Sequence, residues 1–149
     1  MTDRVTSPSG FYLLEPEVAG GWGANIKVHR QSHPPVVTHM HYEFQGWLGD
    51  DLLTTFPEFI VTERLAMALD QSALTGFELA AVEVSPGDMW EQCHPTRPLP
   101  QCRWLKMTGP AGKEDFGRTE LADLVVSHAA LELLRGFAIN DCEVRPWTA

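Results

Sequence analysis

Apolar and polar residues follow the same pattern twice along this chain. Residues 59–79 read FIVTERLAMALDQSALTGFEL and residues 124–144 read LVVSHAALELLRGFAINDCEV, and a constant shift of 65 positions aligns them without a gap. Each copy has an apolar triplet, a hydroxyl residue, a helical stretch, a turn and an extended stretch with one glutamate. This repetition predicts a scaffold of two like modules, at about residues 57–85 and 121–147.

The helix of the first module is predicted from its apolar spacing. Leu65, Ala66 and Leu69 recur on one helical face. Thr62 precedes them as a candidate N-cap, and Gly76 is a natural terminator. By analogy, we expect residues 124–126 to be extended and a second helix to run from about residue 128 to 135, after the equivalent Ser127.

Strict alternation identifies the clearest strand at residues 36–47, where Thr38, Met40, Tyr42 and Phe44 alternate with polar side chains. Weaker strand patterns cover residues 11–17, 26–30, 77–85, 104–109 and 142–147.

The segments between the expected strands contain turn-forming residues. We expect loops at residues 20–23, 86–103 and 110–117, and a short helical or irregular piece around residues 50–53. The predicted fold class is therefore α+β, with a mainly antiparallel or mixed sheet and two short helices from the internal repeat.

Length and composition predict one domain over residues 1–149, with residues 1–9 loose. A net charge of −9 argues against direct nucleic-acid binding, because phosphates would be repelled. The three cysteines and the lack of an apolar leader or membrane-spanning run predict a cytoplasmic protein without a membrane role.

The sharpest candidate for metal chemistry is His39, His41 and Glu43. On one strand, these three side chains project from the same face and together offer two imidazoles and a carboxylate to a divalent ion. The other interpretation is a polar strand face that meets solvent. We find no P-loop, dinucleotide or nucleophile-elbow motif, so we expect no cofactor and no catalytic residue, and an enzyme is the less favoured hypothesis.

Acidic and aromatic residues that lie close together in the sequence suggest a protein-binding surface. Aromatic side chains supply buried contact energy, and complementary charge speeds encounter with a basic partner. The candidate partner-binding residues are Trp47, Asp50, Asp51, Phe56, Glu58 and Glu63.

The stretch GWLGDDLLTTFPEFIVTERLAMALDQSALTGFELAAVEV, followed by WLKMTG, DFG and LVVSHAALELLRGFAINDCEVRPW, resembles bacterial polymorphic-toxin immunity proteins, in particular relatives of the myxobacterial double-CxxCG family. The resemblance covers roughly residues 46–147 and lies in structural motifs. This chain has no CxxC, so a zinc knuckle is not carried over.

The resemblance implies a cytosolic immunity protein that neutralises a cognate toxin by occlusion, as a monomer or homodimer. Two alternatives stay open: a metal-binding domain or metal-dependent enzyme that uses His39, His41 and Glu43, and a structural protein that assembles through a sheet edge.

Overall fold

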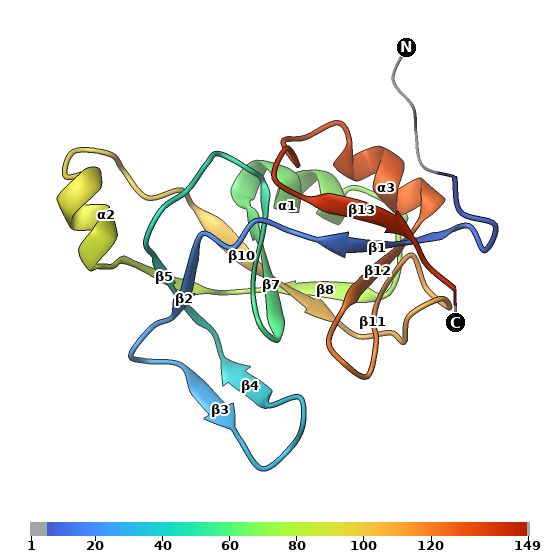
Figure 1. Cartoon of the computed structure of the whole chain (residues 1–149), viewed down its shortest axis with the longest axis horizontal. Coiled ribbons are helices and arrows are strands. Elements are labelled where there is room, and N and C mark those ends of the chain that lie inside the picture. The colour runs from blue at the N-terminus through green and yellow to red at the C-terminus, as the bar shows by residue number, and fades with distance from the viewer. Residues whose placement is uncertain (1–5, 149) are drawn as a thin grey trace.

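Two four-stranded antiparallel sheets form the body of the molecule over residues 6–148, which the computed structural model describes (Figure 1). Sheet I has the strand order β6-β7-β10-β8, and sheet II has the order β11-β12-β1-β13. Sheet I comprises β6 (Leu52–Thr55), β7 (Glu58–Thr62), β10 (Cys102–Met107) and β8 (Phe77–Ala80). Sheet II comprises β11 (Phe116–Arg118), β12 (Leu124–Ser127), β1 (Phe11–Glu15) and β13 (Glu143–Pro146).

The two sheets are the two copies of the sequence repeat. In sheet I, Phe59 pairs with Thr54 on one side and Leu105 on the other. In sheet II, Leu124 pairs with Arg118 and with Leu14 in the same manner. A helix follows the second strand in each copy: α1 (Glu63–Asp70) after β7 and α3 (His128–Leu134) after β12. We call sheet I with α1 the first half, and sheet II with α3 the second half.

The halves differ in where their third strand in sheet order comes from. In the first half this strand is β10, which follows β8 along the chain. In the second half the equivalent place is taken by β1, which precedes every other element. The second half is therefore assembled from segments near both ends of the described chain.

The helix starts follow the predicted positions, and both hydroxyl groups donate to an aspartate: Thr62 to Asp51 at 2.6 Å and Ser127 to Asp115 at 2.7 Å. Ser127 also caps α3, because its Oγ accepts a hydrogen bond from the backbone N–H of Ala130 at 3.1 Å. Thr62 occupies the N-cap position of α1 but makes no cap bond.

A smaller mixed sheet lies beside sheet I and has the order β2-β5-β9. Its strands β5 and β9 run parallel, and the hairpin of β3 and β4 projects from it (Figure 1). Helix α2 lies at the far end of this region. The bounds are β2 (Gly20–Trp22), β3 (Lys27–His29), β4 (Val36–His39), β5 (His41–Phe44), β9 (Glu83–Pro86) and α2 (Asp88–Cys93).

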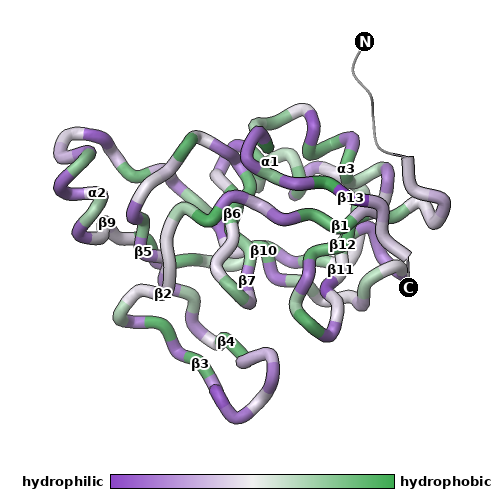
Figure 2. The backbone as a smooth tube through the Cα atoms, viewed as in Figure 1, coloured by the Kyte–Doolittle hydropathy of each residue, from purple (hydrophilic) through white to green (hydrophobic). Residues whose placement is uncertain are grey.

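The core has two clusters of buried side chains. One lies between the sheets and helices of the two halves and includes Leu14, Leu65 and Leu131. The other joins the small sheet to sheet I and includes Phe44 and Trp104. Figure 2 shows hydrophobic stretches along the strands of both halves, whereas the tip of the β3–β4 hairpin is hydrophilic. No helix among residues 6–148 is long and apolar enough to cross a bilayer.

The structure confirms the α+β class with mainly antiparallel sheets and corrects several element predictions. The strand expected over residues 36–47 is interrupted at Met40, and the one expected over residues 77–85 is interrupted at residues 81–82. The piece around residues 50–53 is extended and enters β6, because Leu52 and Leu53 fill different core clusters from opposite faces.

All three predicted loops also contain regular structure. Residues 20–22 form β2, and the proline-rich segment 86–103 contains α2, a third helix that the repeat does not supply. Strand β11 begins at Phe116, inside the loop predicted over residues 110–117. The predicted loose segment 1–9 falls in part on residues 1–5, which lie outside the described residues.

Candidate protein-binding surface

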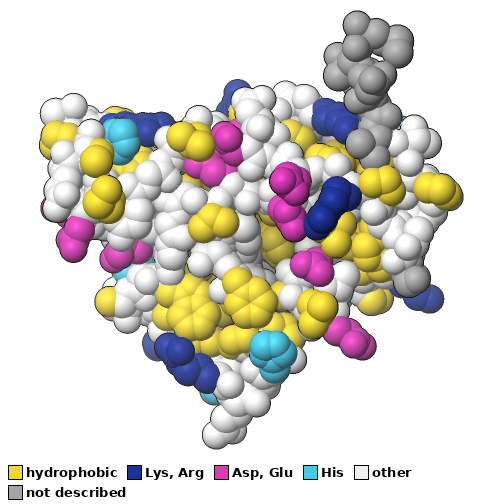
Figure 3. All heavy atoms as spheres, in the orientation of Figure 1, with side chains coloured by type: hydrophobic (Ala, Val, Ile, Leu, Met, Phe, Trp, Pro, Cys, Tyr) yellow, Lys and Arg dark blue, Asp and Glu magenta, His cyan; other side chains and the backbone are white. Residues whose placement is uncertain are grey.

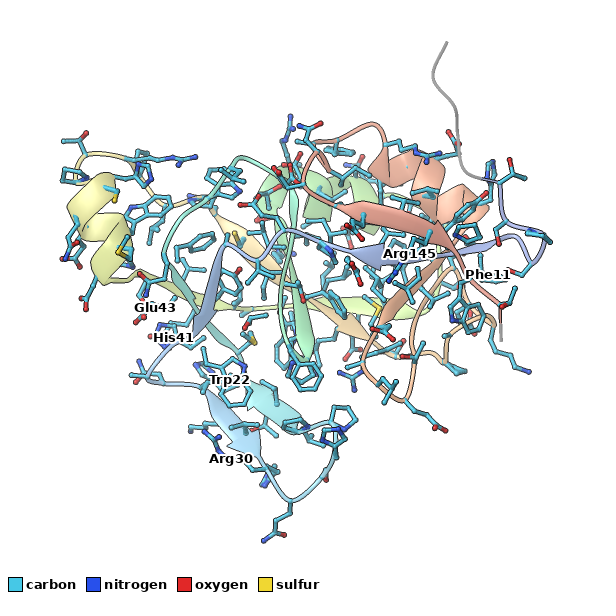
Figure 4. The ribbon with its side chains drawn as sticks, viewed as in Figure 1. Phe11, Trp22, Arg30, His41, Glu43 and Arg145 are labelled. Atoms are coloured by element: carbon cyan, nitrogen blue, oxygen red, sulfur yellow. The ribbon has the colours of Figure 1, made fainter. Side chains whose placement is uncertain are left out.

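The histidine-containing strand does not bring its three candidate metal ligands together. His41 is buried in β5, His39 is exposed at the end of β4, and Glu43 accepts a hydrogen bond from the side-chain amide of Gln45 at 3.0 Å (Figure 4). The carboxylate nearest the imidazoles is that of Glu83 on β9, 3.1 Å from Nε2 of His39 and 3.9 Å from Nε2 of His41. The metal hypothesis for His39, His41 and Glu43 stays a prediction from sequence.

His41 is held in one tautomer, which excludes a serine nucleophile beside it. Its Nδ1 accepts a hydrogen bond from the backbone N–H of Asn25 at 3.0 Å, so the proton of the neutral ring is on Nε2 and points to Oγ of Ser85 at 2.7 Å. A general base needs a free electron pair on that nitrogen. Hydrogen bonds from His39 and Asn25 lower the pKa of Glu83, so this polar cluster links β4, β9 and the segment after β2.

A second group of carboxylates serves as a loop anchor. Among residues 6–148, the ligand atoms of Glu17, Asp50 and Asp141 lie within 4.8 Å of one another. The oxygens of Glu17 accept the backbone N–H groups of Leu48 (2.7 Å) and Asp50 (3.3 Å), and those of Asp50 accept the N–H groups of Asn140 (2.9 Å) and Asp141 (2.7 Å). Burial raises the pKa of Glu17 despite these bonds. The backbone donors account for the arrangement of Glu17 and Asp50.

Asp51 ties three separate segments together. Its carboxylate accepts hydrogen bonds from Thr62 Oγ1 (2.6 Å), from Arg64 Nε (2.8 Å) and Nη2 (2.6 Å), and from the backbone N–H of Ala138 (2.8 Å). Burial opposes ionisation, but these bonds outweigh it and lower the pKa of Asp51. The carboxylate therefore joins the start of α1 to the segment after α3.

Glu58 forms the main ionic contact between the two halves. Its Oε1 accepts from the indole N–H of Trp104 at 2.9 Å, and its Oε2 accepts from Nη1 of Arg118 at 3.0 Å. The same Nη1 donates to the backbone oxygen of Pro57 at 3.1 Å. Burial raises the pKa of Glu58, and the bonds from Trp104 and Arg118 offset only part of that rise.

The carboxylates predicted to face a partner are largely turned inward. Asp50, Asp51 and Glu58 are buried and hold internal hydrogen bonds, so they do not form an exposed acidic face. Glu63 is half-buried and pairs with Arg103 at 3.0 Å. The prediction of an acidic surface around residues 50–63 is therefore corrected. The carboxylates of that segment form hydrogen bonds and ion pairs within the chain.

The two predicted aromatic anchors have different environments. Trp47 is half-buried, donates its indole N–H to the backbone oxygen of Asp50 and lies under the guanidinium of Arg97. Phe56, in the turn between β6 and β7, has 52% of its surface exposed. Of the two, only Phe56 offers a large apolar surface to a partner, and its binding role stays a prediction.

The exposed Phe56 forms an aromatic patch with Trp22, whose side chain is half-buried. The indole N–H of Trp22 donates to the backbone oxygen of Phe56 at 2.9 Å, and the guanidinium of Arg30 stacks 5.0 Å from the centre of the Trp22 ring. Figure 3 shows hydrophobic side chains gathered on this face where the β3–β4 hairpin meets the turn of β6 and β7. Figure 4 places Trp22 at the base of the hairpin and Arg30 further toward its tip.

An open groove adjoins this patch at the junction of the two halves. Its volume is about 510 Å³, a size typical of ligand sites. Apolar walls come from β1 and its continuation, from the β6–β7 hairpin and from the start of β12. Three carboxylates line it, those of Glu15, Asp123 and Glu143. The lining also includes Leu14, Val18, Thr54, Phe56, Phe59, Ala122 and Leu124.

Sequence reasoning missed most of this surface. Val18, which is exposed, and Trp22, which is half-buried, lie in a stretch without periodic pattern, so nothing in the sequence marks them as part of a surface. A signal did exist for Asp123, since the 65-residue shift aligns it with Glu58.

Two of the three free cysteines have thiols of raised pKa. Burial raises the pKa of Cys102 and of Cys142 to about 12 each, and both residues are half-buried. Cys93 is exposed at the end of α2. A thiolate nucleophile needs a lowered pKa, so neither Cys102 nor Cys142 fits that role.

Comparisons with protein-family models, with curated proteins and with solved structures found no match to this chain. Its fold and surface therefore carry the functional argument.

Proposed function

We propose that this chain is a non-catalytic protein-binding module of the cytoplasm that neutralises a cognate toxin by occlusion. The observation that supports the proposal is the apolar groove between the halves, continuous at the exposed Phe56 with the half-buried Trp22. An exposed aromatic side chain beside a concave apolar surface is typical of binding hot spots.

The electrostatics favour a basic partner. The chain carries a net charge of −9, and three carboxylates line the groove. Complementary charge would speed encounter, while contact energy would come from the apolar groove walls and Phe56. The partner is thus expected to present a basic surface with apolar side chains.

The proposal involves no turnover. The polar groups that sequence reasoning singled out are engaged in hydrogen bonds within the chain: His41 with Ser85, and Asp51 with Thr62 and Arg64. These bonds stabilise loops and leave the groups poorly placed to transfer protons to a substrate.

A quantitative capture experiment tests the proposal. The protein encoded by the neighbouring gene would be titrated with wild-type chain and with Phe56→Ala, Trp22→Ala and Met67→Ala. Met67 on α1 is the matched control, since its exposed fraction is 53% against 52% for Phe56. We expect the two aromatic variants to weaken binding by about tenfold or more each, and the control by less than about twofold.

Activity of the captured toxin supplies the second readout. Occlusion predicts inhibition that is complete at one equivalent and does not progress with time, whereas an enzyme would inactivate many equivalents. Circular dichroism melting would verify that each variant is folded. If the neighbouring product is not bound, or if Phe56→Ala binds as tightly as Met67→Ala, the proposal is wrong.

A further inference from the structure

We propose that the groove receives an arginine side chain of the protein partner, which pairs with Asp123. This inference rests on the proposed protein-binding function and names the chemistry that the groove recognises. The argument comes from the repeat, because the chain itself contains the corresponding contact already filled at the other junction of its halves.

The strand registers define which residues correspond. Thr54 pairs with Phe59 in sheet I, and Arg118 pairs with Leu124 in sheet II. Because residues 59 and 124 are equivalent under the 65-residue shift, Thr54 of the first half corresponds to Arg118 of the second. The same shift relates Pro57 to Ala122 and Glu58 to Asp123.

At one junction an arginine fills the space between the halves. Arg118 reaches from the second half to the first, where its Nη1 donates to the Glu58 carboxylate at 3.0 Å and to the Pro57 carbonyl at 3.1 Å. Glu58 is buried there.

At the other junction the arginine is replaced by a threonine. Thr54, Ala122 and Asp123 line the open groove, and they correspond to Arg118, Pro57 and Glu58. The Asp123 carboxylate accepts a hydrogen bond from the hydroxyl of Thr119 at 3.3 Å, and the backbone groups of Asp123 bond to the same threonine. Among residues 6–148 no lysine or arginine forms an ion pair with Asp123. The groove therefore corresponds to the junction that Arg118 fills, but it lacks an equivalent cationic side chain.

The rim of the groove repeats this charge difference. In sheet I, Lys106 faces Glu78 across neighbouring strands, and the two form an ion pair at 3.6 Å. The corresponding pair in sheet II is Glu15 and Glu143, two like charges that directly face each other. Like charges in this position destabilise a sheet, and Arg145 offsets the repulsion only through Glu15, at 2.8 Å.

The geometry favours arginine as the occupant. At the filled junction one guanidinium nitrogen, Nη1 of Arg118, bonds to a carboxylate and a backbone carbonyl at once. A guanidinium is more weakly hydrated than an ammonium and is therefore favoured over lysine in a partly buried ion pair. The methylene stem of an inserted arginine would contact the apolar groove walls formed by Leu14, Phe59 and Leu124.

The test is a titration followed by amide chemical shifts in two-dimensional NMR. The probe is the blocked tripeptide acetyl-Leu-Arg-Leu-amide, and its control carries citrulline, the uncharged analogue of arginine, at the centre. We expect the arginine peptide to shift the amide signals of residues 54–56 and 122–124. The citrulline peptide should bind at least about tenfold more weakly than the arginine peptide.

Two variants locate the binding. Asp123→Asn should lower the affinity for the arginine peptide by about tenfold. Asp70→Asn, at the exposed end of α1, should change that affinity by less than about twofold. Thr54→Arg should restore the equivalent of the Arg118 contact within the chain, raise the melting temperature and abolish peptide binding.

Equal binding of the two peptides, absence of shifts in the groove, or an unchanged affinity in Asp123→Asn would each overturn the arginine assignment. These failures are distinguishable from failure of the proposed function. If Phe56→Ala still weakens capture of the neighbouring product while Asp123→Asn does not, the protein-binding role stands and only the arginine pocket is wrong.

Discussion

Replacing Asp51 with asparagine tests the anchoring role of the inward-facing carboxylates. The wild-type side chain is 3% exposed and accepts four hydrogen bonds from Thr62, Arg64 and Ala138. Asparagine has nearly the same shape but offers one acceptor oxygen and one donor group. Whichever way the side chain is turned, its NH2 group would face N–H or O–H groups that are themselves hydrogen-bond donors.

The magnitude follows from the bonds that are lost. With the asparagine oxygen toward Thr62, the backbone N–H of Ala138 faces another donor, at a cost of about 1–3 kcal/mol for an unmade hydrogen bond. Weakening of the charge-assisted bond from Thr62 adds about 1 kcal/mol. Because a neutral amide is easier to bury than a carboxylate, we expect about 2–4 kcal/mol in total for Asp51→Asn.

Urea unfolding at neutral pH measures this loss, which corresponds to a midpoint lower by about 1–2 M. The repeat supplies a matched control in Asp115, which holds Ser127 at 2.7 Å and the backbone N–H of Thr75 at 3.0 Å. Asp115 is less buried, so water can replace its bonds, and Asp115→Asn should cost about 1 kcal/mol or less. An equal or larger loss in Asp115→Asn would refute the reasoning.

The pKa of Asp51 is lowered in the folded state, so its contribution to stability is present at neutral pH and lost on acidification. A pH series of unfolding curves should therefore show that Asp51→Asn loses less stability in acid than the wild type does. Parallel pH profiles for the two proteins would contradict this expectation.

Three further predictions concern other parts of the molecule. The pKa of Glu58 is raised in the folded state, so the folded protein holds this proton more tightly than the unfolded chain does. Stability should therefore fall as the pH rises from the usual pKa of a glutamate to the raised pKa of Glu58. Glu58→Gln should flatten this slope in a pH series of melting curves. A Cβ at Gly76, which has φ +95°, would lie 2.0 Å from the backbone oxygen of Phe116. At Gly10, where φ is +81°, no atom lies within 4 Å of an added Cβ. Gly76→Ala should therefore lower the urea midpoint more than Gly10→Ala does, and equal losses would contradict this. A thiol reagent at mildly alkaline pH should modify the exposed Cys93 first and the half-buried Cys102 and Cys142, whose pKa values are raised, much more slowly. A uniform rate for all three would contradict this.

The repeat made much of the fold predictable. Once two copies were aligned, the start of the second helix at residue 128 followed from the first, although propensity alone would have allowed a longer helix. Local pattern also predicted β1, because its residues FYLLE form a largely apolar run. Strand β13 was predicted from the Asn140-Asp141 turn signal before it.

Tertiary contacts decided the parts that the sequence did not predict. Helix α2 forms within a proline-rich segment because Trp90 is buried against Phe44, while its indole N–H donates to the backbone oxygen of Arg97. The break at Met40 separates β4, which pairs in the hairpin, from β5, which lies between β2 and β9. Neither contact is visible in the local order of residues.

The prediction of an acidic surface was wrong for a different reason. A run of acids such as Asp50 and Asp51 looks like a charged surface, but sequence does not say which backbone N–H groups will converge on them. Conversely, Trp22 became part of the surface through its contact with Phe56, across a long sequence separation. Charge and aromatic content alone therefore do not distinguish an anchor from a docking face.

The placement of β1 between β12 and β13 has a consequence for the order of folding. A growing chain that has reached Met107 already possesses every strand of sheet I, whereas β1, although made first, has neither neighbour until β12 and β13 emerge. Closing that distant contact carries a larger entropic cost than forming the local hairpins of sheet I. Strand β1 would thus stay unpaired until β12 and β13 have been made, and the groove would be completed after sheet I.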